Sequence, residues 1–501
     1  MRELELKLEL SDWDAKRLGG ELRYGELAMG RNAIRKLRTV FFDTPEHDLH
    51  TAGFSLRLRR QNGRWLQSVK ANQRVGDGKS TAIELEDPID TGKPDPARIT
   101  DNKLKRAVQD TVRGASLHPV FETVIKQTTR KLKTQGSQKK LAVRYDTVRS
   151  AERQLVTAEL EVKAGSAKHL LLAVEKLLGD HELKLAGHSK ARYRLALGEG
   201  EANAEPEKAR LARISKRNSC AEAFSAILAS AIRQIVVNRQ AVLQTDDPEG
   251  AHQMRIGLRR LRSALRALRP LVDGASLRVF ERAARDMGRC VGMLRDADVL
   301  ITGIQAPMEQ VASDKSGFSE LRDVLARDLE TKRDEVRRAL QGPTWTRLQL
   351  YLALWPRTLE DHNGLARPIT EHARSVLHTA WRRPVKLARN LDRLDAEHRH
   401  EMRKALKELR YQTEFFAPLF KGREARDFIE QLKALQEVFG YINDAHMAPR
   451  LVEVQIQHRA GVDAGRAASY ALGRHEAEAA HVWQGARRLW KQLKRSPRFW
   501  T

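Results

Sequence analysis

The sequence predicts two domains of different class: an α+β domain built on an antiparallel β-barrel, then an all-α domain made of a duplicated helical unit. Two observations carry this prediction. Up to about residue 163, charged and apolar residues alternate with a period of two, which is typical of strands. From about residue 211 the pattern changes to long amphipathic stretches rich in Ala, Leu and Arg, in which two sequence blocks recur at one fixed offset.

The strands of the first domain follow from this alternation and from turn signals. Residues 1–10 alternate Leu with Glu and Lys without a break. A hairpin is expected around Asn62-Gly63, and Pro88 is expected to stop a later strand. The predicted strands are 1–10, 38–43, 54–60, 64–71, 81–87, 119–132, 140–149 and 155–163, with helices over 95–113 and 166–179. Helices among antiparallel strands give an α+β barrel.

Pairs of like charges at i and i+2 recur in these strands. Glu3 and Glu5 precede Lys7, Arg57 precedes Arg59, and Glu159 precedes Glu161. One interpretation is an amphipathic sheet with its charged face in water. An inward face of this kind, dry and unpaired, would be very costly. It is reasonable if it holds a polyanion and a divalent cation, because carboxylates bind Mg²⁺ or Mn²⁺ while Arg and Lys bind phosphate oxygens. The pattern therefore favours a tunnel that handles phosphate.

The composition limits the classes of partner that we expect the protein to bind. The formal net charge is +26, and both parts are basic: 38 Lys and Arg against 27 Asp and Glu up to residue 200, then 53 against 38. We expect a soluble fold with an anionic partner. Cys220 and Cys290 are too few for a disulfide framework. We see no apolar leader and no run of about 18 apolar residues, so we expect a cytoplasmic protein with no membrane partner.

The helical part contains an internal repeat. The block that begins at His252 reappears at His400, and the block that begins at Gly292 reappears at Gly440, both with an offset of 148 residues. Each copy carries a basic stripe beside an apolar stripe at helical spacing. If the two units pack through their apolar stripes about a pseudo-two-fold axis, the basic stripes face a common groove. The alternative is two solvated basic faces.

The ordered strand motifs resemble the CYTH family, the triphosphate tunnel metalloenzymes. The motifs are Glu3-x-Glu5-x-Lys7, Phe41-Phe42-Asp43-Thr44-Pro45, Ser55-x-Arg57-x-Arg59, Ser68-Val69-Lys70, Glu84-x-Glu86, Arg130, Asp146, Glu159-x-Glu161 and Ser189-Lys190, over about 195 residues. The resemblance implies a triphosphate tunnel domain over residues 1–197, followed by a linker over 198–214 that is small, acidic and contains Pro206.

The resemblance also implies roles for these residues. The metal ligands are Glu3, Glu5, Asp146, Glu159 and Glu161, which hold Mg²⁺ or Mn²⁺. The substrate-binding cations are Lys7, Arg57, Arg59, Lys70, Arg130 and Lys190. Glu3, Glu5, Lys7 and Lys70 are the expected catalytic residues. Lys163 is a departure, because many relatives carry a third acid at that position.

The helical part resembles the CHAD domain, a helical duplication found fused to CYTH domains. The resemblance covers about residues 215–495, with repeats at about 215–345 and 365–495. It implies that inorganic polyphosphate binds in a basic central channel. The expected polyphosphate-binding residues are His252, Arg255, Arg259 and Arg262 in the first repeat and His400, Arg403, Lys407 and Arg410 in the second.

Three functions compete at this point. The first is metal-dependent hydrolysis of inorganic tripolyphosphate to phosphate and pyrophosphate, with polyphosphate bound by the helical domain. The second keeps the fold but makes the chain an adenylate cyclase or a thiamine triphosphatase. The third is a non-enzymatic polyphosphate-binding protein, against which the clustered carboxylates argue. Few aromatic residues are interleaved with the basic stripes and no helix-turn-helix or zinc module is recognised, which argues against nucleic acid as the partner.

Overall fold

The chain forms two compact units, Met1–Glu201 and Ala202–Thr501. The computed structural model describes the backbone of residues 4–10, 23–24, 27–29, 33–61, 64–75, 79–134, 137–149, 154–163, 171, 183–185, 205–272, 274–420 and 422–501. The helix predicted over 166–179 lies outside these residues except for Leu171. The boundary between the units falls inside the predicted linker.

The N-terminal unit is an antiparallel sheet. Its strands are β1 (Leu4–Leu10), β2 (Arg23–Tyr24), β3 (Leu27–Met29), β4 (Ala33–Asp43), β5 (Phe54–Gln61), β6 (Arg64–Val75), β7 (Lys79–Ile89), β8 (His118–Thr134), β9 (Ser137–Arg149), β10 (Gln154–Lys163) and β11 (Leu183–Leu185). The main path runs β11-β1-β10-β9-β8-β4-β5-β6-β7, and β3 pairs with β8 and β2. The α+β class predicted for this unit is therefore confirmed.

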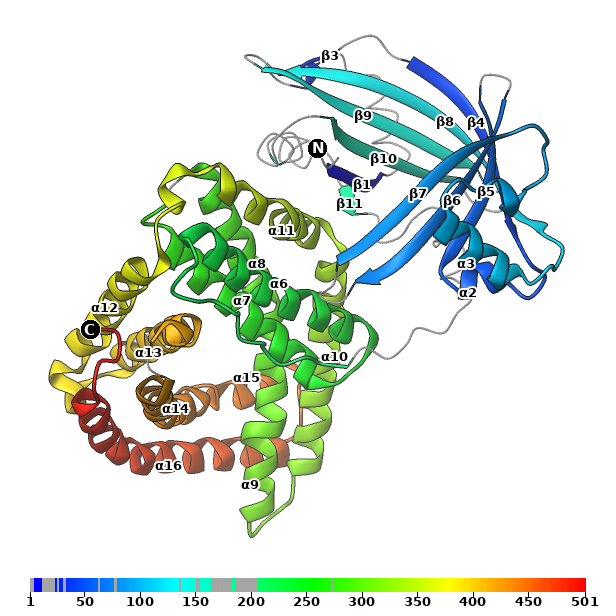
Figure 1. The fold of residues 1–501 in the computed structure, drawn as a ribbon. Helices are drawn as coiled ribbons and strands as arrows, with labels where there is room; N and C mark the ends of the chain where they lie inside the picture. The colour runs from blue at the N-terminus through cyan, green and yellow to red at the C-terminus, as the bar shows by residue number, and fades with distance from the viewer. Residues whose placement is uncertain are drawn as a thin grey trace. The chain divides into compact units, whose positions relative to one another are not determined.

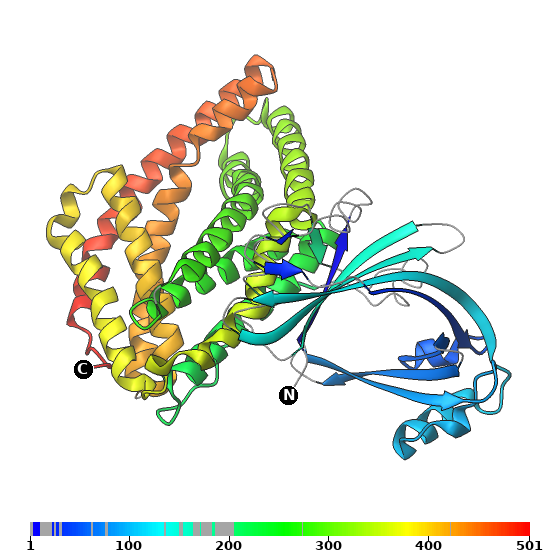
Figure 2. The ribbon, with the colours of Figure 1, turned by 90° about the horizontal axis from the view of Figure 1, so that it is seen from above.

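The described ladders do not close this sheet into a barrel. Within the described residues, β7 pairs with β6 and β11 pairs with β1, so these two strands stand at the ends of an open path. The strands are long and strongly curved (Figure 2). Pro88 does not stop β7 as predicted, because the strand continues to Ile89. A proline is tolerated in a strand at the end of a sheet, where one side of the backbone needs no partner.

Two helices cover one face of β5, β6 and β7 (Figure 1). They are α2 (Asp48–Thr51) and α3 (Asn102–Val112), which begins after the short helix η1 (Pro96–Arg98). Leu56 and Val69 are 1% exposed and pack against a cluster that includes Val108 of α3 and Leu49 of α2. Successive strand residues point to opposite faces, so this packing assigns the other face of these strands to Arg57, Arg59 and Lys70.

The C-terminal unit is helical, as predicted. Its α-helices are α6 (Cys220–Gln244), α7 (Pro248–Leu268), α8 (Ala275–Val299), α9 (Ala306–Val311), α10 (Phe318–Gln341), α11 (Pro343–Leu354), α12 (Ile369–Leu387), α13 (Ala396–Phe416), α14 (Gly422–Ala445), α15 (Pro449–Gln457) and α16 (Val462–Arg495). Shorter turns are η2 (Leu300–Gln305, π-helical), η3 (Trp355–Asp361), η4 (Asn363–Leu365), η5 (Ala388–Arg393) and η6 (Ala417–Leu419).

The duplication is visible in the helices. In Figure 1 the first repeat is drawn in green shades and the second in yellow to red. Helices α7 and α13 have bounds that differ by the repeat offset. The apolar stripes predicted on them are buried: Met254, Leu258, Leu261, Leu265 and Leu268 on α7, and Met402, Leu406, Leu409 and Phe416 on α13, are each at most 1% exposed.

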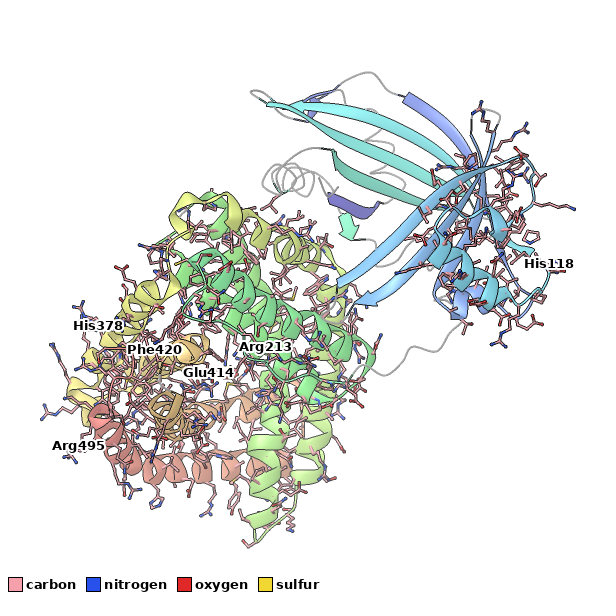
Figure 3. All side chains as sticks on the ribbon, in the orientation of Figure 1. His118, Arg213, His378, Glu414, Phe420 and Arg495 are labelled. Carbon is pink, nitrogen blue, oxygen red and sulfur yellow. The ribbon has the colours of Figure 1, made fainter. Side chains whose placement is uncertain are left out.

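The two repeats meet through reciprocal contacts. The Cys220 N–H donates to the Arg367 carbonyl over 2.8 Å, and the Ile369 N–H donates to the Asn218 carbonyl over 3.1 Å. These two bonds flank an antiparallel bridge between Ser219 and Pro368, which directly precede the first helix of each repeat, α6 and α12, so the contact is reciprocal. Side chains between α7 and α13 follow the same rule. Arg260 pairs with Glu414, and its equivalent Glu408 pairs with Arg266, the equivalent of Glu414. Figure 3 labels Glu414 among the side chains of the helical unit. The seam between α7 and α13 therefore includes ion pairs, in addition to the apolar stripes that we expected to form it.

The ends of the helical unit extend beyond the predicted bounds. Residues 205–214 were assigned to the linker, but Glu207 binds Arg233 of α6 through two bonds of 2.8 Å and also contacts Asn238. At the other end, Phe499 and Trp500 are 7% and 2% exposed and pack in an aromatic cluster with Phe428. Polar anchors and isolated aromatic residues carry no periodic signal, so the pattern did not reveal them.

Helix α6 corrects one expectation about hydropathy. Among the described residues it is one helix whose length and composition are sufficient to cross a membrane, although we saw no such segment in the sequence. Its apolar residues serve the core of the unit, since Phe224, Ile227 and Leu228 are fully buried. Length and composition alone are weak evidence of a membrane span.

Candidate functional site

Backbone register brings the charged residues of the N-terminal sheet onto one face. Residues that pair directly across neighbouring strands share a face of the sheet. Glu5 pairs with Glu161, and Lys7 pairs with Glu159. Glu159 in turn pairs with Arg144 of β9, and Asp146 lies two positions further along the same face. We call this side of the sheet the polar face.

The polar face continues to the far end of the sheet. From β9 the pairing passes through Gln127 and Thr129 of β8 to Arg35 and Ala33 of β4. Strand β4 then pairs with β5, which places Arg57 and Arg59 on the polar face. The last ladders add Ser68 and Lys70 of β6, followed by Glu84 and Glu86 of β7. Acids or bases on this one surface thus come from β1, β4, β5, β6, β7, β9 and β10.

The described side chains of this face form a mixed charge network. Arg59 donates to both carboxylate oxygens of Glu86, at 2.8 and 3.2 Å, and Ser68 donates to the same carboxylate over 3.1 Å. The side chains of Arg59 and Glu86 are 21% and 39% exposed. Glu86 thus orients a basic neighbour on the polar face. Both bonds come from one guanidinium nitrogen, so the contact holds one end of Arg59 and leaves its other N–H groups for an anion.

Arg130 does not share the polar face, contrary to prediction. It pairs with Val143, whose partner on β10 is Leu160. A shift of one residue moves a side chain to the other face of a strand. In this segment polar residues occupy consecutive positions, and the prediction selected a position on the other face of β8. Lys131 and Lys133 hold polar-face positions instead, opposite Ala142 and Lys140. Arg144 was also missed, although its spacing from Asp146 is the i, i+2 signal that selected other residues.

Several predicted site residues cannot be placed in more detail. Glu3 and Lys190 lie outside the described residues, and so do the side chains of Glu5, Lys7, Asp146, Glu159 and Glu161. Among the side chains that are described, no group of three or more His, Cys, Asp or Glu could hold a metal ion. What the backbone provides is the pairing of acidic positions on β1 and β10. Carboxylate oxygens are the ligands that Mg²⁺ and Mn²⁺ prefer, so this donor set fits such an ion.

The helical unit contains a basic cavity of about 370 Å³ between the repeats. It is lined by Arg259, Arg262, Ser263, Arg266, Arg383, His400, Arg403, Lys404, Lys407, Glu408 and Tyr411. Arg259, Arg262, His400, Arg403 and Lys407 were predicted as polyphosphate-binding residues, and the structure brings them to this cavity. Arg383 of α12 and Lys404 of α13 were missed. Lys404 follows His400 by one helical turn, which is a signal that could have selected it.

Three cations that line this cavity, Arg259, Arg403 and Lys407, and the neighbouring Arg255 act on one another. Burial, and then the charge of Arg255, lowers the pKa of Arg259 to about 10. Burial, followed by the charges of Arg259 and Arg403, lowers the pKa of Lys407 to about 6. We call Arg255, Arg259, Arg403 and Lys407 the basic quartet, which consists of two equivalent positions from each repeat. Like charges held together in a partly dry site favour a bound anion.

Hydrogen bonds to α8 and α14 orient two members of the basic quartet. Arg255 donates to Asp296 over 2.6 Å and to the Gly292 carbonyl over 3.2 Å. The equivalent Arg403 donates to the side chain of Asn443 over 2.9 Å. Asp296 thus orients an arginine in the first repeat. In the second repeat, Arg403 is oriented by Asn443, the residue before Asp444, which is the equivalent of Asp296.

Of the other predicted residues, Arg262 and His400 line the cavity, whereas His252 and Arg410 do not. Burial, then the charge of Arg295, lowers the pKa of His252. Arg410 lies 3.4 Å from Glu414 and over the ring of Tyr411. Burial lowers the pKa of His400, which lines the cavity and hydrogen-bonds to Asn443. The two histidines at the heads of the stripes thus have different surroundings.

Comparison with known proteins also divides the chain into an N-terminal and a C-terminal domain. Residues 1–193 match the CYTH domain family, and residues 226–453 match the CHAD domain family. The crystal structure of the CHAD domain from the plant Ricinus communis is 30% identical, covers 59% of this chain and 99% of its own, and superposes with a TM-score of 0.52.

A curated relative matches part of the chain. The inorganic triphosphatase of Haemophilus influenzae is 25% identical over 202 residues, which is 40% of this chain and 55% of that protein. The matched region thus spans about half the length of that relative. A Hippeastrum protein described as having a dominant triphosphatase activity is 20% identical over 39% of this chain and 96% of its own, with a TM-score of 0.30, too low to bear on the reaction. The chain belongs to the proteins that join an N-terminal CYTH domain to a C-terminal CHAD domain.

Proposed function

We propose that the N-terminal domain hydrolyses inorganic tripolyphosphate to phosphate and pyrophosphate with a divalent metal ion, and that the helical domain binds inorganic polyphosphate. The match to the CYTH family and the relative named inorganic triphosphatase support a triphosphatase. The match to the CHAD family supports a helical module that works beside it.

The observation that carries the proposal is the pairing of β1 with β10. Glu5 stands opposite Glu161, and Glu159 follows on the same face. Like charges directly across a ladder destabilise it. A hard divalent cation between such carboxylates removes the repulsion. A site that binds phosphate without a metal ion gains nothing from paired carboxylates. The paired acids therefore favour a metal-dependent reaction over anion binding alone.

The residues of the polar face divide into two groups by chemistry. Glu5, Glu159 and Glu161, together with Glu3 and Asp146, would hold Mg²⁺ or Mn²⁺. Such an ion supplies charge neutralisation and Lewis acidity at a phosphoryl group when bound. The phosphate oxygens would be bound by Lys7, Arg57, Arg59 and Lys70, which would hold the tripolyphosphate in line for attack by water. The bond between Arg59 and Glu86 fixes one of these cations in advance.

The basic cavity supports the second half of the proposal. Its lining includes Arg259, Arg262, Arg266, Arg403 and Lys407, with Glu408 as its carboxylate. The basic quartet places two cations from each repeat around a shared space, as a linear polyanion requires. Ion pairs to phosphate gain strength in such a partly buried site, because water screens the charges less.

Phosphate release from tripolyphosphate, ATP and thiamine triphosphate, with and without Mg²⁺, tests the reaction. We expect metal-dependent release from tripolyphosphate that Glu5→Gln abolishes. Faster release from thiamine triphosphate, or cyclic AMP from ATP, would replace the substrate by one of the alternatives on the same fold. No release from any substrate, with polyphosphate still bound, would make the chain a polyphosphate-binding protein.

A further inference from the structure

A second cavity of about 250 Å³ adjoins the basic cavity in the second repeat. His400 and Arg403 line both cavities, so the two spaces share a wall. The second cavity is also lined by Phe439, Ile442, Asn443 and His446 of the α14 region. A ligand whose anionic part occupies the basic cavity can therefore extend a different chemical group into this one.

The lining of the second cavity differs in kind from that of the first. Phe439 and Ile442, which are 1% and 4% exposed, form an apolar floor. Asn443, His400 and His446 place amide and imidazole groups around it. Apolar surface with a few polar groups is typical of a site for an organic ring, whereas a site for phosphate alone is lined by cations.

Arg399 gives this cavity a flat cationic wall. Its guanidinium lies over the Trp483 ring, 4.3 Å from the ring centroid. Arg399 lines the cavity, and Trp483 is not one of the lining residues. The buried Nε atoms of Arg399 and Arg403 have no hydrogen-bond partner among the described residues. Aromatic bases stack on guanidinium planes.

The first repeat lacks these features at the equivalent positions. The repeat offset relates Arg399 to Ala251, Phe439 to Val291, and His446 to Asp298. Asp298 is 4% exposed, and burial raises its pKa to about 6. A guanidinium wall and an aromatic floor are thus not required by the fold of a repeat, because the first repeat forms the same helices without them.

We infer that the second cavity is a nucleobase site, and that the helical domain binds nucleoside polyphosphates with the base in this cavity and the phosphates on the basic quartet. The inference rests on the proposed function only for the binding of the phosphates, and not for the binding of the base. The base stacks on Arg399, and its polar edge meets the His400, Asn443 and His446 side chains that line the cavity. An inorganic chain carries no planar group and leaves the cavity filled with water.

Calorimetric titration of the full chain tests the inference, with EDTA present so that metal-dependent turnover does not consume the ligand. Adenosine 5′-tetraphosphate is compared with linear inorganic tetraphosphate, which has the same number of phosphates. We expect the nucleotide to bind at least about fivefold more tightly, the low end of the effect of one stacked base.

Two substitutions separate stacking from charge. Arg399→Lys keeps the positive charge but removes the plane, so the nucleotide should lose its advantage while the inorganic chain binds as before. Arg327→Lys, at an exposed position on α10, is the matched control and should change neither affinity. Equal affinities in the unmodified chain, or an advantage that survives Arg399→Lys, would overturn the nucleobase site alone. Failure of both ligands to bind would overturn it together with the proposed polyphosphate function.

Discussion

The polar face of the sheet and the basic quartet of the helices both gather cations, but they balance charge differently. On the polar face, cations alternate with carboxylates, as Arg59 does with Glu86. In the helical domain, Lys407 has Arg259, Arg403 and Arg255 as its strongest charged influences. A face with both signs is suited to a metal ion and a phosphate at once, and so to a reaction. A site with cations in excess is suited to holding a polyanion.

The largest expected effect would separate the two surfaces completely. Glu5→Gln removes one carboxylate of the pair formed with Glu161, and we expect tripolyphosphate hydrolysis to fall by more than about 100-fold. Polyphosphate binding should not change. Steady-state phosphate release and calorimetry measure the two properties. Glu46→Gln, at an exposed position after β4, is the matched control. If both properties fell together in Glu5→Gln, the comparison between two independent surfaces would be wrong.

The reverse substitution should act on the helical domain alone. Arg259→Ala combined with Lys407→Ala removes one pair of equivalent cations from the basic quartet. We expect polyphosphate to bind about 10- to 100-fold more weakly, since two charge-assisted contacts are lost. Hydrolysis of tripolyphosphate should stay within about twofold. Calorimetry with a defined chain length measures the first, and Arg327→Ala provides a control for net charge. A large fall in hydrolysis would show that the helical domain is part of the active site.

The seam between the repeats offers a comparison within one domain. Arg260 is 2% exposed and pairs with Glu414, whereas in the symmetry-related pair Arg266 is 46% exposed and pairs with Glu408. Arg260→Ala removes the buried partner of Glu414, which keeps only Arg410, and should cost about 2 kcal/mol of unfolding free energy. Arg266→Ala should cost about 1 kcal/mol or less, because water reaches that pair. Urea unfolding measures both, and equal costs would mean that burial does not distinguish the two pairs.

The smallest expected effect concerns a single proton. The pKa of Lys407 is lowered to about 6 in the folded chain, so the amine is mostly neutral at pH 7.5. A bound polyanion raises that pKa, and binding should therefore take up as much as one proton. Titrations in buffers of different ionisation enthalpy measure the uptake, which Lys407→Met should remove. Binding enthalpies that do not depend on the buffer would contradict the prediction.

The same group has a defined effect on stability. Because the folded pKa of Lys407 lies below that of an unfolded lysine, the unfolded chain binds more protons between about pH 6 and pH 10. The contribution of Lys407 to the free energy of unfolding therefore increases as the pH rises through that window. Thermal unfolding of the chain and of Lys407→Met, followed across this pH range without polyanion, isolates that contribution.

The sequence predicted most of the elements because periodicity reports directly on burial. The stripe from Met254 to Leu268 is apolar at helical spacing, and the structure buries it fully. The strand alternation identified the charged positions of β1, β5 and β10. It failed at Arg130, because a segment with polar residues at consecutive positions does not define which parity faces the site. Only pairing with a neighbouring strand settles that, and pairing partners are not a local property of the chain.

The helical site shows a second kind of limit. The stripes indicated which residues share a helix face, but not which residues of other helices meet them. Arg383 reaches the basic cavity from α12, and Trp483 of α16 supports Arg399 through a contact across 84 residues of chain. Such contacts depend on how the repeats pack. The motif positions were sufficient to predict the cations of the basic cavity. The structure was needed to find the apolar cavity beside them.

The reciprocal bonds between Cys220 and Arg367 and between Ile369 and Asn218 have a consequence for fragment complementation. Each repeat contributes the same strand-like step before its first helix, so the seam does not depend on the peptide that joins the repeats. A cut near Gly364 in η4 would leave both bonds, and the ion pairs between α7 and α13, available to separate polypeptides. The two fragments carry the information to reassociate as a pseudo-symmetric heterodimer, the arrangement that a single ancestral repeat would adopt with its own copy.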